Sequence, residues 1–70
     1  MSVISGNIRR LMKERKLSYE KLGRMIGTTA PAVSNWVHEV NDPSYYALCR
    51  MKKAFDVPWE VLLEGCEKDA

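Results

Sequence analysis

Residues 17–36 read LSYEKLGRMIGTTAPAVSNW, and this stretch decides the fold. Ser18 is a good N-cap and predicts the start of a short helix. Gly27 ends that helix, because glycine adopts the left-handed conformation of a helix C-terminus at little cost. Three apolar positions recur at helical spacing between these two residues and predict the buried stripe: Leu22, Met25 and Ile26.

A second short helix follows the glycine directly. Thr28 or Thr29 caps it, and Pro31 falls in the first turn, where its missing N–H is not needed. Val33 and Trp36 form its apolar stripe, and a turn signal within residues 37–43 ends it. Two helices of this length joined by a glycine turn are typical of a helix-turn-helix, although many helical bundles contain a similar corner.

Three further helices are expected outside this pair, and the chain shows no strand pattern, internal repeat or low-complexity segment. The first runs from Ser5 to Lys16, the fourth from the Ser44 cap to about Asp56, and the last from Pro58 to Gly65. Their apolar positions are Ile8, Leu11, Met12, Leu48, Met51, Phe55, Trp59, Leu62 and Leu63. The prediction is an all-α, compact five-helix domain over residues 1–65, with a frayed tail over residues 66–70.

Length and composition narrow the classes of function. A chain of 70 residues with 46% hydrophobic and 29% charged residues suits one small globular domain. It contains no apolar segment of membrane-spanning length and no secretory signal, so we expect a cytoplasmic protein. Cys49, Cys66 and the single His38 do not supply a structural zinc site, and Cys49 is expected to be a buried free thiol. No catalytic arrangement or phosphate loop is present, which favours a binding module without cofactor, metal or small-molecule substrate over an enzyme.

Charge is unevenly distributed although the net charge is only +2. Residues 1–24 hold seven Lys and Arg against two Glu, a balance of +5. Residues 56–70 hold one Lys against five Asp and Glu, a balance of −4. This asymmetry suits a protein that presents one face to a polyanion, but ordinary solvated helix surfaces explain it equally well.

Residues 17–36 closely resemble the helix-turn-helix of the Cro/lambda-repressor-like family. The matching marks are Leu17-Ser18, Leu22-Gly23, Gly27, Val33-Ser34 and Trp36, and the resemblance extends over residues 4–65. It implies sequence-specific binding of double-stranded DNA by a transcription regulator, a repressor or Cro-like protein of phage or prokaryotic type. It also implies a homodimer on a palindromic operator, with no role for a membrane.

The resemblance implies which residues read bases. In this family the start and exposed face of the second helix of the motif contact base edges, which here are Thr29, Ala30, Pro31, Ser34 and Asn35. The Asn35 amide suits adenine, since it can bond N6 and N7 together. Ala30 and Pro31 offer only apolar contact, which suits a thymine methyl group.

Other positions are candidates for backbone phosphates and for a dimer interface. The phosphate candidates are Ser18, Tyr19, Thr28, His38 and Asn41, with Tyr19 standing near the family's usual glutamine. Tyr45 and Tyr46 open the fourth helix, and the sequence leaves open which of them points toward a phosphate. The family's use of its fifth helix makes Trp59 and Leu63 dimer candidates, although both also suit the core.

Two departures from the family pattern have consequences. Many members pair an arginine in the first helix of the domain with a glutamate just after the second helix of the motif, which is the DNA-recognition helix. The matching positions here are Met12 and Val37. Joint replacement by apolar residues avoids a lone buried charge and predicts that the two side chains touch. The exposed face of the second helix of the motif also lacks Arg, Lys and Gln, so cations for the phosphates must come from elsewhere. The sequence leaves open which basic residues face the DNA among Arg9, Arg10, Lys21, Arg24, Arg50, Lys52 and Lys53. The same lack leaves open an alternative function as a protein-interaction module that has lost most base readout.

Overall fold

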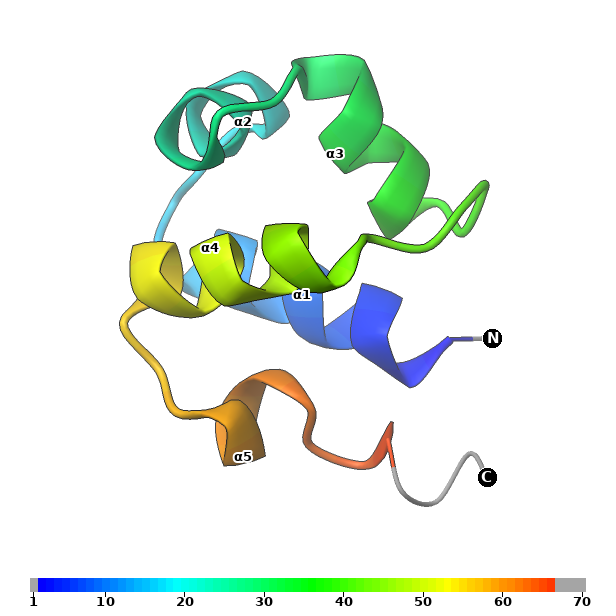
Figure 1. Cartoon of the computed structure of the whole chain (residues 1–70), viewed down its shortest axis with the longest axis vertical. Coiled ribbons are helices and arrows are strands. Elements are labelled where there is room, and N and C mark those ends of the chain that lie inside the picture. Colours follow the sequence, from blue (N-terminus) through cyan, green and yellow to red (C-terminus); the bar gives the residue numbers. More distant parts are fainter. Residues whose placement is uncertain (1, 67–70) are drawn as a thin grey trace.

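The computed structural model describes residues 2–66, which form five helices and, within that range, no strand. The helices are α1 (Val3–Glu14), α2 (Tyr19–Ile26), α3 (Ala30–Val37), α4 (Tyr45–Phe55) and α5 (Trp59–Leu62) (Figure 1). The predicted all-α, five-helix architecture is therefore confirmed. No helix in residues 2–66 combines the length and apolar character needed to cross a membrane. Residues 67–70 of the expected frayed tail lie outside the described range, and at its edge the Cys66 N–H bonds the Leu63 carbonyl at 3.0 Å.

Side-chain caps explain where four helices begin. Ser18 and Ser44 accept hydrogen bonds from the N–H groups of the third residue after each, at 3.0 and 3.1 Å, as predicted. Thr29, rather than Thr28, caps α3. Ser2 caps α1, so this helix begins at Val3, two residues before the predicted start at Ser5.

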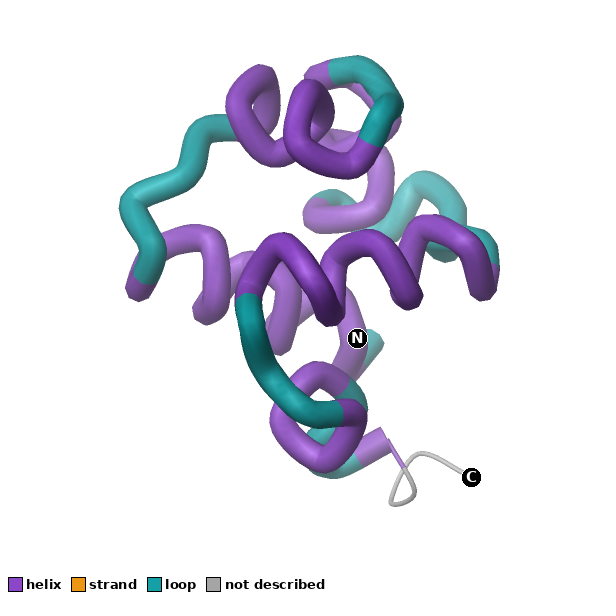
Figure 2. Tube along the Cα trace, turned by 60° about the vertical axis from the view of Figure 1, so that its left-hand side comes forward, coloured by secondary structure: helices purple, strands orange, loops and turns teal. Residues whose placement is uncertain are grey.

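The helices are arranged in three levels (Figures 1 and 2). α2 and α3 lie together at one end of the molecule, α1 and α4 cross its middle, and α5 lies at the other end. α2 packs against α3 and α4, while α1 packs against α3 and α5. One buried apolar core joins them, made of Ile8, Leu11, Met12, Leu22, Ile26, Val33, Trp36, Val37, Met51, Phe55 and Leu62.

Three sequence predictions, two about burial and one about a helix end, are wrong. Met25 is 49% exposed, because Leu22 and Ile26 fill the core-facing stripe of α2 and Met25 falls at its edge. Cys49 is only half-buried, although its thiol is free. The last helix ends at Leu62 and leaves Leu63 as its cap, although Gly65 does adopt the left-handed φ of +85° expected of a terminating glycine.

Met12 and Val37 occupy the core as expected for a paired apolar replacement. Their exposed fractions are 5% and 2%, and both belong to the same buried cluster. An unpaired charge at either position would have no water to solvate it. Direct contact between the two side chains stays a prediction.

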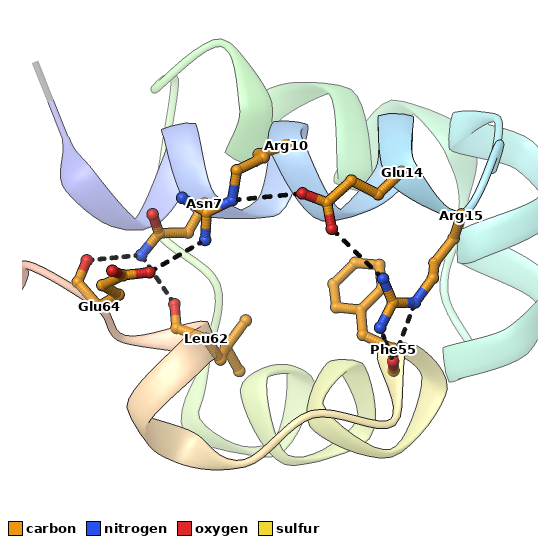
Figure 3. Close-up of polar contacts among 7 residues, drawn as sticks. All are labelled: Asn7, Arg10, Glu14, Arg15, Phe55, Leu62 and Glu64. Carbon is orange, nitrogen blue, oxygen red and sulfur yellow. Dashed lines mark hydrogen bonds and ion pairs between the residues drawn. The ribbon is translucent and has the colours of Figure 1, made fainter.

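Side chains of α1 and Arg15 hold the lower part of the molecule together (Figure 3). The buried Asn7 donates two bonds of 2.9 Å to the carbonyls of Leu62 and Glu64, at the end of α5. Arg15 donates bonds of 3.1 and 2.8 Å to the Phe55 carbonyl, at the end of α4. A helix as short as α5 has little stability of its own, so these bonds position it.

Candidate nucleic-acid interface

The corner between α2 and α3 is tight because two glycines permit it. Gly27 adopts φ +78°, and the Thr28 N–H bonds the Gly23 carbonyl at 2.7 Å to close the end of α2. A Cβ atom on Gly23 would lie 3.0 Å from the backbone carbon of Thr29. The small residue at position 23 therefore lets the start of α3 approach α2 closely.

The C-terminal end of α3 is anchored by α1 rather than by its own loop. The Ser5 hydroxyl donates to the Trp36 carbonyl at 2.6 Å, and the Arg9 guanidinium donates to the Val37 carbonyl at 3.3 Å. These carbonyls are among those that a helix end leaves without partners. The Ser2 N–H also bonds the Glu39 carboxylate just beyond the helix. The C-terminal end of α3 is thus fixed without using its outer side.

The predicted base-reading residues share the outer side of α3. Thr29 and Pro31 are exposed, while Ala30, Ser34 and Asn35 are half-buried. The opposite side is buried and consists of Val33, Trp36 and Val37. Within residues 2–66 the Asn35 side chain has no hydrogen-bond partner, so its amide is available to a ligand.

Two predicted phosphate candidates from different helices come together beside this surface. The rings of Tyr19, which starts α2, and His38, which ends α3, meet edge to face with centroids 6.1 Å apart. His38 Nδ1 lies 2.8 Å from the Ser34 carbonyl and 3.2 Å from its hydroxyl. Because a carbonyl only accepts, we assign the proton to Nδ1, and Nε2 has no partner within the described residues. Ser34 is therefore partly committed to His38.

The remaining phosphate candidates are distributed differently. Ser18 and Asn41 are exposed, one at the start of α2 and the other in the loop after α3. Thr28 lines a hollow of about 180 Å³ between the motif's turn and α4, and neither Tyr19 nor His38 lines it. We call this the turn–α4 hollow; its lining is Ile26, Gly27, Thr28, Trp36, Ser44, Tyr46, Ala47 and Arg50.

The turn–α4 hollow also separates the roles of the two tyrosines. Tyr46 lines it, whereas Tyr45 stacks on Trp59 with centroids 6.4 Å apart and ring planes 14° apart. Lys52 places its ammonium group 5.8 Å from the centre of the Trp59 ring. Tyr45 therefore belongs to the α5 side of the molecule, and Tyr46 to the side of the helix-turn-helix.

Trp59 and Leu63, the predicted dimer residues, are half-buried. Both line a second hollow of about 370 Å³, which we call the α5 hollow, together with Glu60, Glu64 and Gly65. An aromatic and an aliphatic side chain between two carboxylates form an amphipathic surface. Trp59 and Leu63 thus pack partly against the core and remain partly exposed.

The structure gives definite contacts to Ser5, which the sequence analysis did not consider for the site, and to Arg9 and Arg50, which it left among several candidate cations. Ser5 and Arg9 hold the end of α3, and Arg50 donates a bond of 3.1 Å to the Ile26 carbonyl at the end of α2. Sequence patterns carry no signal for these bonds, because their acceptors are backbone carbonyls present at every position. In contrast, Arg10 and Arg24 form exposed ion pairs within the chain.

Comparisons with known proteins agree with this geometry. A family model described as helix-turn-helix matches residues 8–62. Among solved structures, the chain is similar to the P22 c2 repressor protein, crystallised with the synthetic operator 9T in the presence of Tl+. The identity is 28% and the TM-score 0.81, with 93% of this chain and 98% of that chain covered. A search of curated proteins finds no match. With most of its length matched by the family model, the chain belongs to the helix-turn-helix family, in its phage-repressor-like form.

Proposed function

We propose that this protein regulates transcription by binding a specific double-stranded operator, with α3 in the major groove. The observation that carries the proposal is the division of α3 into one buried and one free side, with its C-terminal end anchored by α1. A major groove admits one such helix. The similarity to a repressor solved with its operator supports the same assignment.

Base readout falls to the outer side of α3. Asn35 pairs with an adenine through its free amide, and Pro31 with Ala30 contacts the methyl group of a thymine. Thr29 and Ser34 contribute single hydroxyls. The preferred half-site is therefore expected to be defined mainly by A·T pairs.

Backbone contacts flank this surface. The Tyr19 phenol supplies one phosphate contact, its O–H donating to a phosphate oxygen while the His38 ring packs against it edge to face. Ser18, which precedes Tyr19, and Asn41, in the loop after α3, are further exposed donors. Such contacts fix the position of the protein on the duplex without reading its sequence.

We further propose that two copies occupy a palindromic operator as a repressor or Cro-like protein and exclude polymerase sterically. The half-sites would lie about one helical turn apart. Trp59 and Leu63, at the α5 hollow, would meet their counterparts in the second copy. Lys52 lies over the Trp59 ring, and Glu60 follows Trp59 in the chain. A two-fold axis through this surface would let Lys52 of one copy pair with Glu60 of the other.

Selection from a random duplex library tests the function, followed by titration of the selected duplex at several salt concentrations. A palindromic sequence with steeply salt-dependent affinity is the expected result, because phosphate contacts release counterions. If no sequence is enriched and binding is negligible at low salt, operator binding is wrong. The absence of Arg, Lys and Gln from the outer side of α3 would then favour a protein-interaction module.

A further inference from the structure

Arg50, like Arg9, differs from the other three arginines in what surrounds its charge. Arg10, Arg15 and Arg24 each lie within 4.0 Å of a glutamate, whereas Arg50 forms no ion pair among residues 2–66. Its one described bond goes to the neutral Ile26 carbonyl, through a single nitrogen, Nη1. A guanidinium carries five N–H donors, so most of its donors remain available beside the hollow.

The turn–α4 hollow surrounds this cation with hydroxyl groups from separate elements. Thr28 comes from the turn of the motif, while Ser44 and Tyr46 come from the start of α4. Within residues 2–66 the Thr28 and Tyr46 hydroxyls have no hydrogen-bond partner, and Ser44 uses its oxygen only as an acceptor. The described lining contains no carboxylate.

We propose that the turn–α4 hollow binds a phosphoryl group, held by the Arg50 guanidinium and the Thr28, Ser44 and Tyr46 hydroxyls. One cation with three separate hydroxyl donors suits a tetrahedral anion with several acceptor oxygens better than a planar carboxylate with two. The bond to Ile26 fixes the guanidinium before the anion arrives. The phosphoryl group belongs either to the backbone of a bound duplex, a possibility that rests on the proposed function, or to free phosphate.

The first part of the test compares Arg50→Gln with Lys13→Gln on the duplex selected by the wild-type protein. Both variants lose one positive charge, but Lys13 lies on α1 and does not line the hollow. Loss of one phosphate contact should reduce the slope of log affinity against log salt by about 0.9 in Arg50→Gln alone. Tyr46→Phe should weaken affinity without changing that slope. Because the Tyr46 side chain is 76% exposed, this variant keeps the test valid if Arg50→Gln unfolds.

The second part titrates the wild-type protein with inorganic phosphate against chloride at equal ionic strength, followed by NMR. Shifts confined to the Thr28 and Ala47 amides and Arg50 Nε would assign the hollow to free phosphate, and Tyr46→Phe should reduce them. A slope change without such shifts would assign it to the duplex backbone. If neither is seen, the phosphoryl site is wrong. If the wild-type protein binds no duplex, the proposed function fails separately, and the phosphate titration alone decides the site.

Discussion

Ser34 and Asn35 are neighbours on α3, yet their side chains have different commitments. The Ser34 hydroxyl lies 3.2 Å from His38 Nδ1, whereas the Asn35 amide has no partner within residues 2–66. With the proton on Nδ1, the Ser34 hydroxyl accepts from His38 and keeps only its O–H to donate, whereas the Asn35 amide offers both a donor and an acceptor to a base edge. Asn35 therefore carries most of the polar discrimination that we propose for this face.

Asn35→Ala should relax the preference at one base position by about 1–3 kcal/mol, because a two-pronged amide contact is lost. The thermal midpoint should change little, since no described bond within the fold uses the amide. Library selection with the variant, compared with the wild-type protein, measures the effect. Ser34→Ala is the matched control, and an unchanged preference in Asn35→Ala would remove Asn35 from the readout.

Individual residues show where sequence reasoning succeeds and where it stops. The sequence identified the outer residues of α3, because helical spacing and the family resemblance both determine which side is free. It misplaced Met25, since a short helix leaves its stripe edges ambiguous and only the packing against α4 resolves them. It also left Arg50 among several surface cations, because the carbonyl that holds its guanidinium is invisible in a sequence.

At the scale of the element, the corner between α2 and α3 depends on the lack of a side chain at Gly23. Its surroundings are backbone atoms of Thr28 and Thr29, which cannot rotate away as a side chain would. Gly6 provides the opposite case, because it lies inside α1 and a Cβ atom added there would meet nothing within 4 Å. Gly23 is therefore required for steric reasons, whereas Gly6 only lowers the helix propensity of α1.

Gly23→Ala should destabilise the fold by about 1–3 kcal/mol, since the added methyl group forces the turn apart. Gly6→Ala should stabilise it by about 0.5–1 kcal/mol, because alanine loses less conformational entropy in a helix. In a domain of this size, each kcal/mol shifts the thermal midpoint by about 4–8 °C. Equal midpoints for the two variants would contradict the close approach at Gly23.

Most element boundaries were predictable because they depend on local chemistry. Ser18 and Ser44 cap as expected, and Gly27 takes the left-handed conformation that ends α2. The early start of α1 at Val3 shows why apolar periodicity alone misplaces a helix start. The apolar pattern becomes visible only at the first residue that the helix buries. The N-cap lies before the first buried residue, and here Ser2 is that cap.

At the scale of the whole molecule, α1 connects the helix-turn-helix to α5. Its polar side chains bond the end of α3 on one side, through Ser5 and Arg9, and the end of α5 on the other, through Asn7. Asn7 is only 5% exposed and satisfies two carbonyls at once. Such long-range pairing could not be predicted from the sequence, since an asparagine within a helix resembles any solvated polar residue.

Asn7→Ala should cost about 1–3 kcal/mol, because two carbonyls lose their donor in a buried place. Amide exchange should accelerate most in α5, since that short helix depends on these bonds. Arg10→Gln is the control, because its exposed ion pairs with Glu14 and Glu64 are worth at most about 1 kcal/mol. Uniform acceleration across all helices would show that Asn7 supports the whole fold rather than α5.

The anchoring of α3 by α1, through bonds to the Trp36 and Val37 carbonyls, has a practical consequence for redesign. Ala30, Pro31 and Asn35 take no part through their side chains in any described hydrogen bond that holds this helix. These three positions can therefore be randomised together while the scaffold stays intact. The chain would then serve as a compact frame for selecting new operator specificities.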